Sequence, residues 1–286
     1  MQGIKLVSLA LNVPGCFATY RIKELGAQVT KVEPPGGDPL IGMSQEWYRQ
    51  LTQDMEVMRL DLKDQGDYLL LEERLNEADI LLSSMRPAAL QRLGLGWQDL
   101  HARFPGLCHV ALSGYPGPHE NRPGHDLTYQ AEAGLLSPPD LPLTLLADLA
   151  GAERAASAAL ALLLARERGY GASYQIVSLF EAGLDFTGPL RYGLTTAGGI
   201  LGGGLAGYNL YPARTGWIAV ATLEGHFHEK LVRELGLKDG DRLEGAFLSK
   251  TALDWATWAQ ARDLPLVEVT GLSGIHPRRE GGSPAP

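Results

Sequence analysis

The sequence predicts an α/β fold, with a mostly parallel, Rossmann-like sheet that carries helices on both faces. Short apolar runs alternate with segments of helical spacing through the first 125 residues, which is the pattern of such folds. The first unit is a strand over Ile4–Leu11, a helix over Gly15–Leu25 and a strand over Val29–Val32. A βαβ unit of this kind spans roughly 30 residues and requires parallel strands joined by a right-handed crossover.

The same alternation continues after the Pro34–Pro39 loop. Further strands are predicted over Met58–Leu62, Ile80–Ser83 and Leu107–Ser113, with helices over Tyr68–Asn76 and Pro87–Leu93 between them. Ligands of parallel α/β sheets bind beyond the carboxyl ends of the strands. Lys31, Arg86 and His125 all fall at or just after such ends, so we expect a site at this edge of the sheet.

The C-terminal third predicts a smaller α+β domain. A long helix over Ala155–Ala165 and a segment over Tyr174–Leu179, either a strand or the start of a helix, precede six glycines between Gly198 and Gly207. Beyond them we predict a strand over Trp217–Leu223, helices over His226–Leu235 and Ala252–Ala261, and a return strand over Leu264–Val269. The prediction is a large domain over 1–197 and a small domain over 198–263. Residues 264–286 are a segment that can return to the large domain.

The composition bounds the function. Of 286 residues, 45% are apolar and 20% charged, as in an ordinary globular protein. The net charge of −8 argues against a general binder of nucleic acids or anionic membranes. Cys16 and Cys108 form no CxxC pair, so neither a zinc site nor a disulfide framework is predicted. Neither an export signal nor a membrane span is predicted, and the expected location is the cytoplasm.

Groups that can carry protons precede two predicted helical segments. His125 and Asp126 stand before one of them, and Asp148 stands before the long Ala-rich helix. The positive end of a helix stabilises a carboxylate and also an anionic oxygen that develops on a substrate. The simpler interpretation, in which Asp148 is a helix cap and His125 a loop histidine, stays open from spacing alone.

Four stretches in order resemble the class III CoA-transferase family, which includes formyl-CoA and carnitine CoA-transferases and α-methylacyl-CoA racemase. They are residues 25–38 (LGAQVTKVEPPGGD), residues 78–96, Leu146-Ala147-Asp148 with its helix, and Val220–Glu224. The resemblance implies an acyl-CoA substrate, an interlocked homodimer, and no metal or cofactor apart from the CoA of the substrate.

Within this family, Gly124-His125-Asp126 with Tyr129 is similar to the racemase branch, and Glu224 matches the racemase glutamate that pairs with the histidine. The resemblance implies inversion of the 2-methyl carbon of a branched acyl-CoA through an enolate. His125, oriented by Glu224, would serve one face of the carbon and Asp148 the other, with helix-start N–H groups near Asp126 or Asp148 as oxyanion donors. Two alternatives stay open: a CoA-transferase that forms an aspartyl thioester on Asp148, and a non-catalytic CoA-binding relative.

The resemblance also indicates residues for the CoA moiety. Lys31, Arg86 and Arg92 would bind its phosphates, although each could equally be a surface charge. Tyr129 would pack near the thioester or belong to the core. A basic stretch typical of the family is replaced by Thr52–Arg59, which carries one cation, so part of the CoA recognition is expected to differ.

Overall fold

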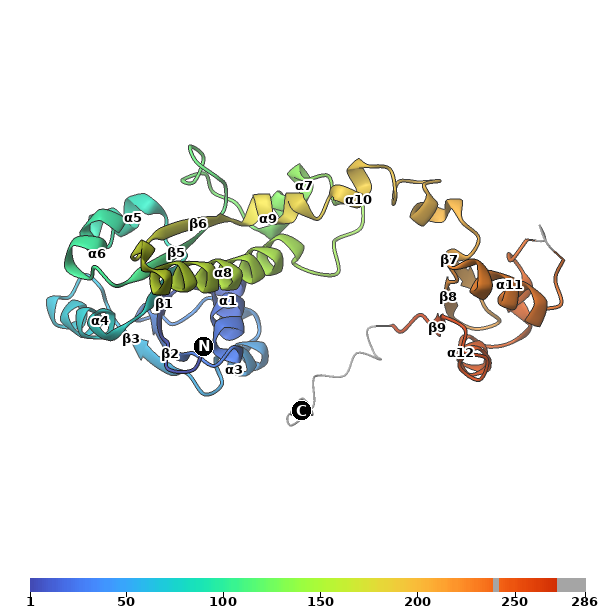
Figure 1. The fold of residues 1–286 in the computed structure, drawn as a ribbon, viewed down its shortest axis with the longest axis horizontal. Helices are drawn as coiled ribbons and strands as arrows, with labels where there is room; N and C mark the ends of the chain where they lie inside the picture. The colour runs from blue at the N-terminus through green and yellow to red at the C-terminus, as the bar shows by residue number, and fades with distance from the viewer. Residues whose placement is uncertain (239–241, 272–286) are drawn as a thin grey trace. The chain divides into compact units, whose positions relative to one another are not determined.

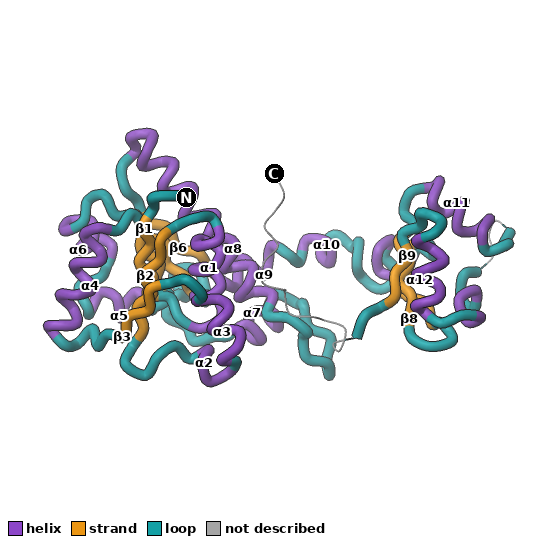
Figure 2. Tube along the Cα trace, turned by 90° about the horizontal axis from the view of Figure 1, so that it is seen from below, coloured by secondary structure: helices purple, strands orange, loops and turns teal. Residues whose placement is uncertain are grey.

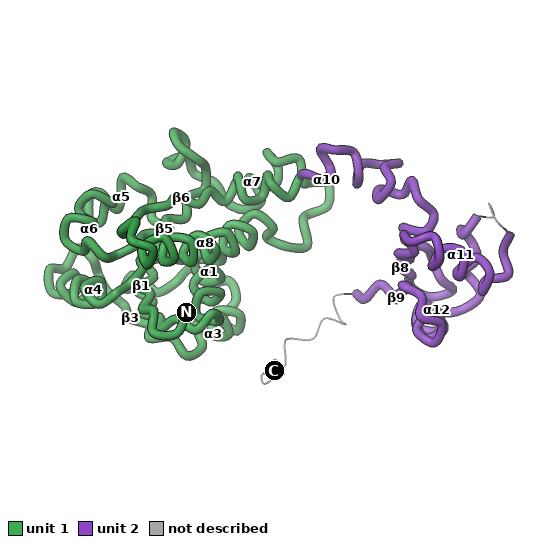
Figure 3. Tube along the Cα trace, viewed as in Figure 1, with its two compact units in different colours: residues 1–187 green, residues 188–286 purple. Residues whose placement is uncertain are grey.

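The computed structural model describes residues 1–238 and 242–271. The chain divides into two compact units, Met1–Thr187 and Gly188–Pro286 (Figure 3). The predicted boundary after residue 197 therefore lies too late, because the first unit ends before the short helix α10 (Gly188–Arg191). The predicted fold class is confirmed: the first unit is an α/β domain and the second contains a small antiparallel sheet.

Residues 1–187 form a six-stranded parallel sheet in the order β3-β2-β1-β4-β5-β6 (Figure 1). Its strands are β1 (Lys5–Leu9), β2 (Gln28–Glu33), β3 (Glu56–Arg59), β4 (Ile80–Ser83), β5 (Cys108–Ser113) and β6 (Tyr174–Ser178). β1 pairs with β2 on one side and with β4 on the other, so the direction of strand addition reverses there. Ligands of open α/β sheets bind at this point, beyond the carboxyl ends of the strands.

Helices cover both faces of the sheet (Figure 2). α1 (Asn12–Glu24) and α8 (Leu146–Ala165) pack over one face, and α4 (Gln65–Glu77), α5 (Pro87–Arg92) and α6 (Trp97–Arg103) bury leucines against the other. The shorter helices are α2 (Leu40–Met43), α3 (Gln45–Thr52), α7 (Asp126–Glu132) and α9 (Leu179–Asp185). The ambiguous segment over 174–179 is a strand through Ser178, after which α9 begins.

α8 is longer than the sequence predicts, since it begins at Leu146 rather than near Ala155. Alanines and a glycine on its inner face let it pack closely on the sheet and on α9. A Cβ on Gly151 would lie 2.3 Å from a methyl carbon of Leu179, so a larger residue here requires the Leu179 side chain to move. The early start places Asp148 inside the first helical turn, with Leu145 as the N-cap.

The second unit builds its own core around a three-stranded antiparallel sheet. β7 (Tyr208–Pro212), β8 (Trp217–Ala221) and β9 (Leu266–Glu268) pair in that order, and α11 (Gly225–Glu234) and α12 (Ala252–Gln260) accompany them. Val267 of β9 pairs with Ala219 of β8. The expected return of residues 264–286 to the large domain is therefore wrong for residues 266–268, and residues 272–286 lie outside those described.

Within the described ranges, no helix combines the length and the apolar character needed to cross a membrane.

A buried histidine lies on β5, the second strand from the β6 edge of the large sheet. His109 of β5 is 1% exposed, and its Nε2 lies 2.9 Å from the Ser83 hydroxyl on β4. Its Nδ1 has no hydrogen-bond partner among the described residues. Burial lowers the pKa of His109 to about 3. The folded chain therefore holds this imidazole neutral in a pH range where an unfolded chain protonates it.

We expect His109 to make the protein sensitive to acid. Between pH 6.5 and pH 3 the unfolded chain binds a proton that the folded chain rejects, so stability falls as the pH drops through this window. His109→Gln should reduce the stability lost between pH 7 and pH 4.5 by roughly 2–3 kcal/mol, measured by urea unfolding at both pH values. His119→Gln, at an exposed position, is the control. Equal pH dependence of wild type and His109→Gln would contradict the assignment.

Candidate active site

A cavity of about 290 Å³ lies at the carboxyl edge of the sheet. Its wall is formed by segments that follow β1, β4 and β5, and by the starts of α7 and α8. Its ionisable lining residues are Arg86, Glu120, Arg122, His125, Tyr129 and Asp148. The cavity thus brings together four of the residues selected from the sequence: His125, Asp148, Arg86 and Tyr129.

Asp148 is the acidic group at the start of α8. Its side chain lines the cavity although the residue is only 8% exposed. Burial, and then the negative charge of Asp126, raise the pKa of Asp148 to about 7. A carboxyl group with this pKa can give or take a proton at neutral pH, which an ordinary aspartate does poorly.

Asp126 hydrogen-bonds both to its own helix, α7, and to the start of α8. It is 4% exposed, and its Oδ1 accepts a hydrogen bond from the backbone N–H of Asp148 at 3.0 Å. Its Oδ2 accepts one from the Gln130 amide at 2.5 Å. Asp126 is not among the residues that line the cavity. Both oxygens of Asp126 thus accept hydrogen bonds from the protein, and the expected catalytic role of Asp126 stays a prediction.

His125 lies at the cavity as the N-cap residue of α7, and it is exposed. The Thr128 hydroxyl fixes its backbone, because it accepts from the His125 N–H at 3.1 Å and donates to the His125 carbonyl at 2.8 Å. Asp148 lines the same cavity, so the two residues that the sequence-based hypothesis pairs share one pocket. Their placement on opposite faces of a substrate carbon stays a prediction.

Tyr129 belongs to the core and to the cavity at once. It is 3% exposed, and its ring meets Tyr115 edge-on, with the centroids 5.2 Å apart. A Cβ on Gly114 would lie 2.4 Å from the Tyr129 hydroxyl, and one on Gly124 would lie 2.5 Å from its ring. Burial, and then the charge of Asp148, raise the pKa of Tyr129, so the phenol stays a hydrogen-bond donor.

The two candidate arginines occupy different positions. Arg86 precedes α5, is exposed and lines the cavity. Arg92 lies in the last turn of the same helix, exposed and outside the cavity wall. Only Arg86 is therefore placed beside the acidic and imidazole groups.

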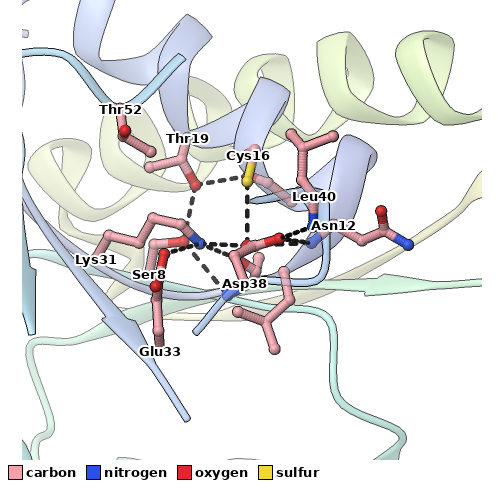
Figure 4. Close-up of polar contacts among 12 residues, drawn as sticks. Ser8, Asn12, Cys16, Thr19, Lys31, Glu33, Asp38, Leu40 and Thr52 are labelled. Carbon is pink, nitrogen blue, oxygen red and sulfur yellow. Dashed lines mark hydrogen bonds and ion pairs between the residues drawn. The ribbon is translucent and has the colours of Figure 1, made fainter. Parts of the chain in front are cut away.

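The proposed phosphate contact of Lys31 is wrong. Its side chain is 0% exposed, and its Nζ donates to the Ala10 carbonyl at 3.0 Å and to Asp38 Oδ2 at 2.9 Å (Figure 4). Asp38 in turn accepts from the backbone N–H groups of Asn12 and Leu40. Lys31 therefore ties β2 to the segments that follow β1 and β2, and its ammonium group has no route to a ligand.

The charges of this buried cluster support that structural role. Burial alone would raise the pKa of Asp38, but the charge and hydrogen bond of Lys31, with the backbone bond from Leu40, outweigh it and lower the pKa. Glu33 lies 3.6 Å from Lys31 and accepts a hydrogen bond from the Tyr48 hydroxyl at 2.7 Å. The Val-Glu-Pro-Pro-Gly-Gly-Asp stretch thus stabilises the fold at the point where strand order reverses.

Sequence reasoning missed a second cavity of about 230 Å³ at the same edge. Its wall is mainly apolar and includes Val32, Leu60 and Leu62, with the exposed Lys63 at its border. Leu11 and Met85 line both cavities, so the two are neighbours. The available signal was the position of Leu60-Asp61-Leu62-Lys63 directly after β3, at a strand end where ligands bind.

Glu224 belongs to the second unit. It follows β8, is the N-cap residue of α11, and is exposed. Its pairing with His125 of the first unit stays a prediction. Among the described residues, no group of three or more His, Cys, Asp or Glu side chains is arranged to hold a metal ion.

A family model provides the identification. The model for CoA-transferase family III matches residues 1–276, and the chain belongs to that family. The fold agrees with this assignment. A hypothetical protein (Rv3272) from Mycobacterium tuberculosis superposes with a TM-score of 0.83 at 26% identity, over 96% of this chain and 86% of its own.

The curated relatives include both CoA-transferases and racemases. The chain is 31% identical over 202 residues to acetyl-CoA:oxalate CoA-transferase from Acetobacter aceti, covering 65% of this chain and 52% of the relative. It is 29% identical over 259 residues to human alpha-methylacyl-CoA racemase, covering 84% of this chain and 66% of the relative. The chain therefore spans between half and two-thirds of the length of these two relatives. Their identities are too similar to choose between racemase and transferase.

We predict that Lys31 contributes to stability rather than to CoA binding. Lys31→Met leaves Asp38 buried without its cation and should lower the free energy of unfolding by about 3–5 kcal/mol. Lys63→Met, at an exposed lysine, should change it by less than about 0.5 kcal/mol. Urea unfolding of both variants measures this. A Lys31→Met protein of wild-type stability that bound CoA weakly would contradict the assignment.

Proposed function

We propose that the chain is an acyl-CoA racemase that inverts the carbon next to the thioester of a 2-methylacyl-CoA. One observation carries the proposal: His125 and Asp148 line the same cavity at the carboxyl edge of the sheet. Inversion removes a weakly acidic proton from one face of the carbon and returns a proton to the other face. Two acid/base groups that share one cavity can do this; a single group cannot.

The protonation of the two groups suits this chemistry. A pKa of about 7 leaves Asp148 partly protonated at neutral pH, so it can act as the acid in one direction and as the base in the other. The enolate oxygen would lie at the positive end of α8, and the Tyr129 hydroxyl at the cavity wall is a candidate donor to it. Orientation of His125 by Glu224 is a further part of the proposal.

CoA would extend from the first cavity into the second. The apolar wall of the second cavity suits a nucleotide base, and Lys63 at its border suits a phosphate. Arg86 lies at the first cavity, where it can contact the pantetheine arm or the diphosphate. Two neighbouring cavities at the carboxyl edge of the sheet thus support an acyl-CoA substrate. A homodimer, which the resemblance implies, and a cytoplasmic location are further parts of the proposal.

A CoA-transferase is the second candidate, favoured by the relatives that carry this activity. In that reaction Asp148 acts as a nucleophile, which must be ionised to attack a thioester. A pKa of about 7 also leaves Asp148 partly ionised at neutral pH, so the same group can act as this nucleophile.

The racemase proposal predicts isotope exchange with a defined stereochemical pattern. Wild type should place deuterium at the α-carbon of a 2-methylacyl-CoA in D₂O and convert either enantiomer into the other. Asp148→Asn and His125→Gln should each lower inversion by about 10²–10⁴-fold. Each should still exchange one enantiomer without inversion, and the two variants should exchange opposite enantiomers. NMR and chiral chromatography of the recovered acyl groups measure this.

Two outcomes would overturn it. No exchange by wild type across short and long acyl chains would exclude the racemase. Trapping of an Asp148 acyl derivative with hydroxylamine, together with transfer of CoA to a free carboxylic acid, would support the transferase instead. Binding of CoA without either reaction would indicate a non-catalytic relative.

If the nucleotide of CoA binds in the second cavity, loss of the Lys63 charge should weaken binding only of substrates that carry the nucleotide. Lys63→Met should raise the KM for acyl-CoA by about tenfold with little change in kcat, because one charged contact to a phosphate is lost. The same variant should process the matching acyl-pantetheine, which lacks the nucleotide, at the wild-type rate. Equal defects with both substrates would show that Lys63 does not contact the nucleotide.

A further inference from the structure

The Gln130 side chain joins the two helices that carry the site. It lies in α7, is 3% exposed, and its amide nitrogen donates to Asp126 Oδ2 at 2.5 Å. The same nitrogen donates to the Thr144 carbonyl at 3.0 Å. Thr144 directly precedes Leu145, the N-cap residue of α8. A single amide group thus connects the Asp126 carboxylate to the entry of the helix that carries Asp148.

We propose that Gln130 is a positioning residue that decides which of two neighbouring buried carboxyl groups, Asp126 or Asp148, carries their proton. The proposal rests on the proposed function, because it concerns the same acid/base group. Gln130 does not line the cavity, so it acts through Asp126 and not on the substrate.

The two carboxyl groups are unequally supplied with donors. Asp126 receives hydrogen bonds from the Asp148 backbone N–H and from the Gln130 amide. Within residues 1–187, none is donated to the Asp148 carboxyl group. Hydrogen bonds to a buried carboxylate favour its ionised form. Both donors go to Asp126, whose negative charge is, after burial, the second cause of the raised pKa of Asp148. Without the Gln130 amide, Asp126 would lose one of its two donors and this difference would shrink.

The other described titratable groups near Asp126 and Asp148 do not hydrogen-bond one of these carboxyl groups in preference to the other. Tyr129, on α7, is coupled electrostatically to both carboxyl groups, to Tyr115 and to Arg86. His125 precedes Asp126 and faces the cavity, and α9 contributes the apolar Leu179 to the same wall. Gln130 differs from these groups because it hydrogen-bonds one carboxylate directly. It is also uncharged, so its effect does not change with pH.

The test follows the proton directly. Protein with ¹³C-labelled aspartate carboxyl groups is titrated by NMR between pH 5 and pH 9, and the two resonances are assigned with Asp126→Asn and Asp148→Asn. In wild type we expect Asp148 to titrate near neutral pH. In Gln130→Met, a side chain of similar length without a donor, we expect the Asp148 titration to move to lower pH, because the neighbouring carboxylate loses one of the two hydrogen bonds that hold its charge. The pH profile of α-carbon exchange should shift in the same direction.

Gln175→Met, which makes the same change at an exposed glutamine of β6, is the control and should titrate as wild type. An Asp148 resonance that titrates in Gln130→Met as it does in wild type overturns the proposal. If circular dichroism shows Gln130→Met to be unfolded, Gln130→Asn, whose shorter side chain withdraws the amide, is titrated with the same criterion. The titration needs no catalytic activity, so failure of this proposal and failure of the racemase proposal are distinguishable.

Discussion

The hydrogen bond from the Asp148 backbone N–H to the Asp126 carboxylate is the contact on which the candidate site depends. It joins the first residue of α7 to the first turn of α8, two helices separated in sequence by a proline-rich loop. It also satisfies one of the N–H groups that a helix start leaves without a partner. The same carboxylate places a negative charge beside Asp148. This interaction therefore fixes the backbone of Asp148, and the charge of Asp126 adds to burial in raising the pKa of Asp148.

A second buried contact fixes the position of loops at the edge of the sheet. The Lys31–Asp38 ion pair fixes the segments after β1 and β2, where strand order reverses and the two cavities meet. A buried pair of this kind is costly unless its remaining hydrogen bonds are made. Here the Ala10 carbonyl and two backbone N–H groups make them. Lys31 and Asp38 line neither cavity, so they hold in place the segments that form the cavity walls.

The fold was largely predictable because its elements are local patterns. Apolar runs and helical spacing predicted the βαβ order. The position of His125 near a strand end and of Asp148 before a helix, together with the family resemblance, predicted that they could meet. Tertiary facts were not predictable. Whether Lys31 reaches a phosphate or Asp38 depends on where the loop after β2 folds back. The pairing of β9 with β8, and the burial of Asp126, likewise depend on partners far away in the sequence.

The most direct test of the account is a crystal structure with a 2-methylacyl-CoA, or a stable thioether analogue of it, bound. The account predicts an α-carbon inside the first cavity, with a His125 ring nitrogen and an Asp148 carboxyl oxygen on opposite faces, each within about 3.5 Å. A complex in which both groups lie on one face of the carbon, or in which the thioester lies outside this cavity, would contradict it.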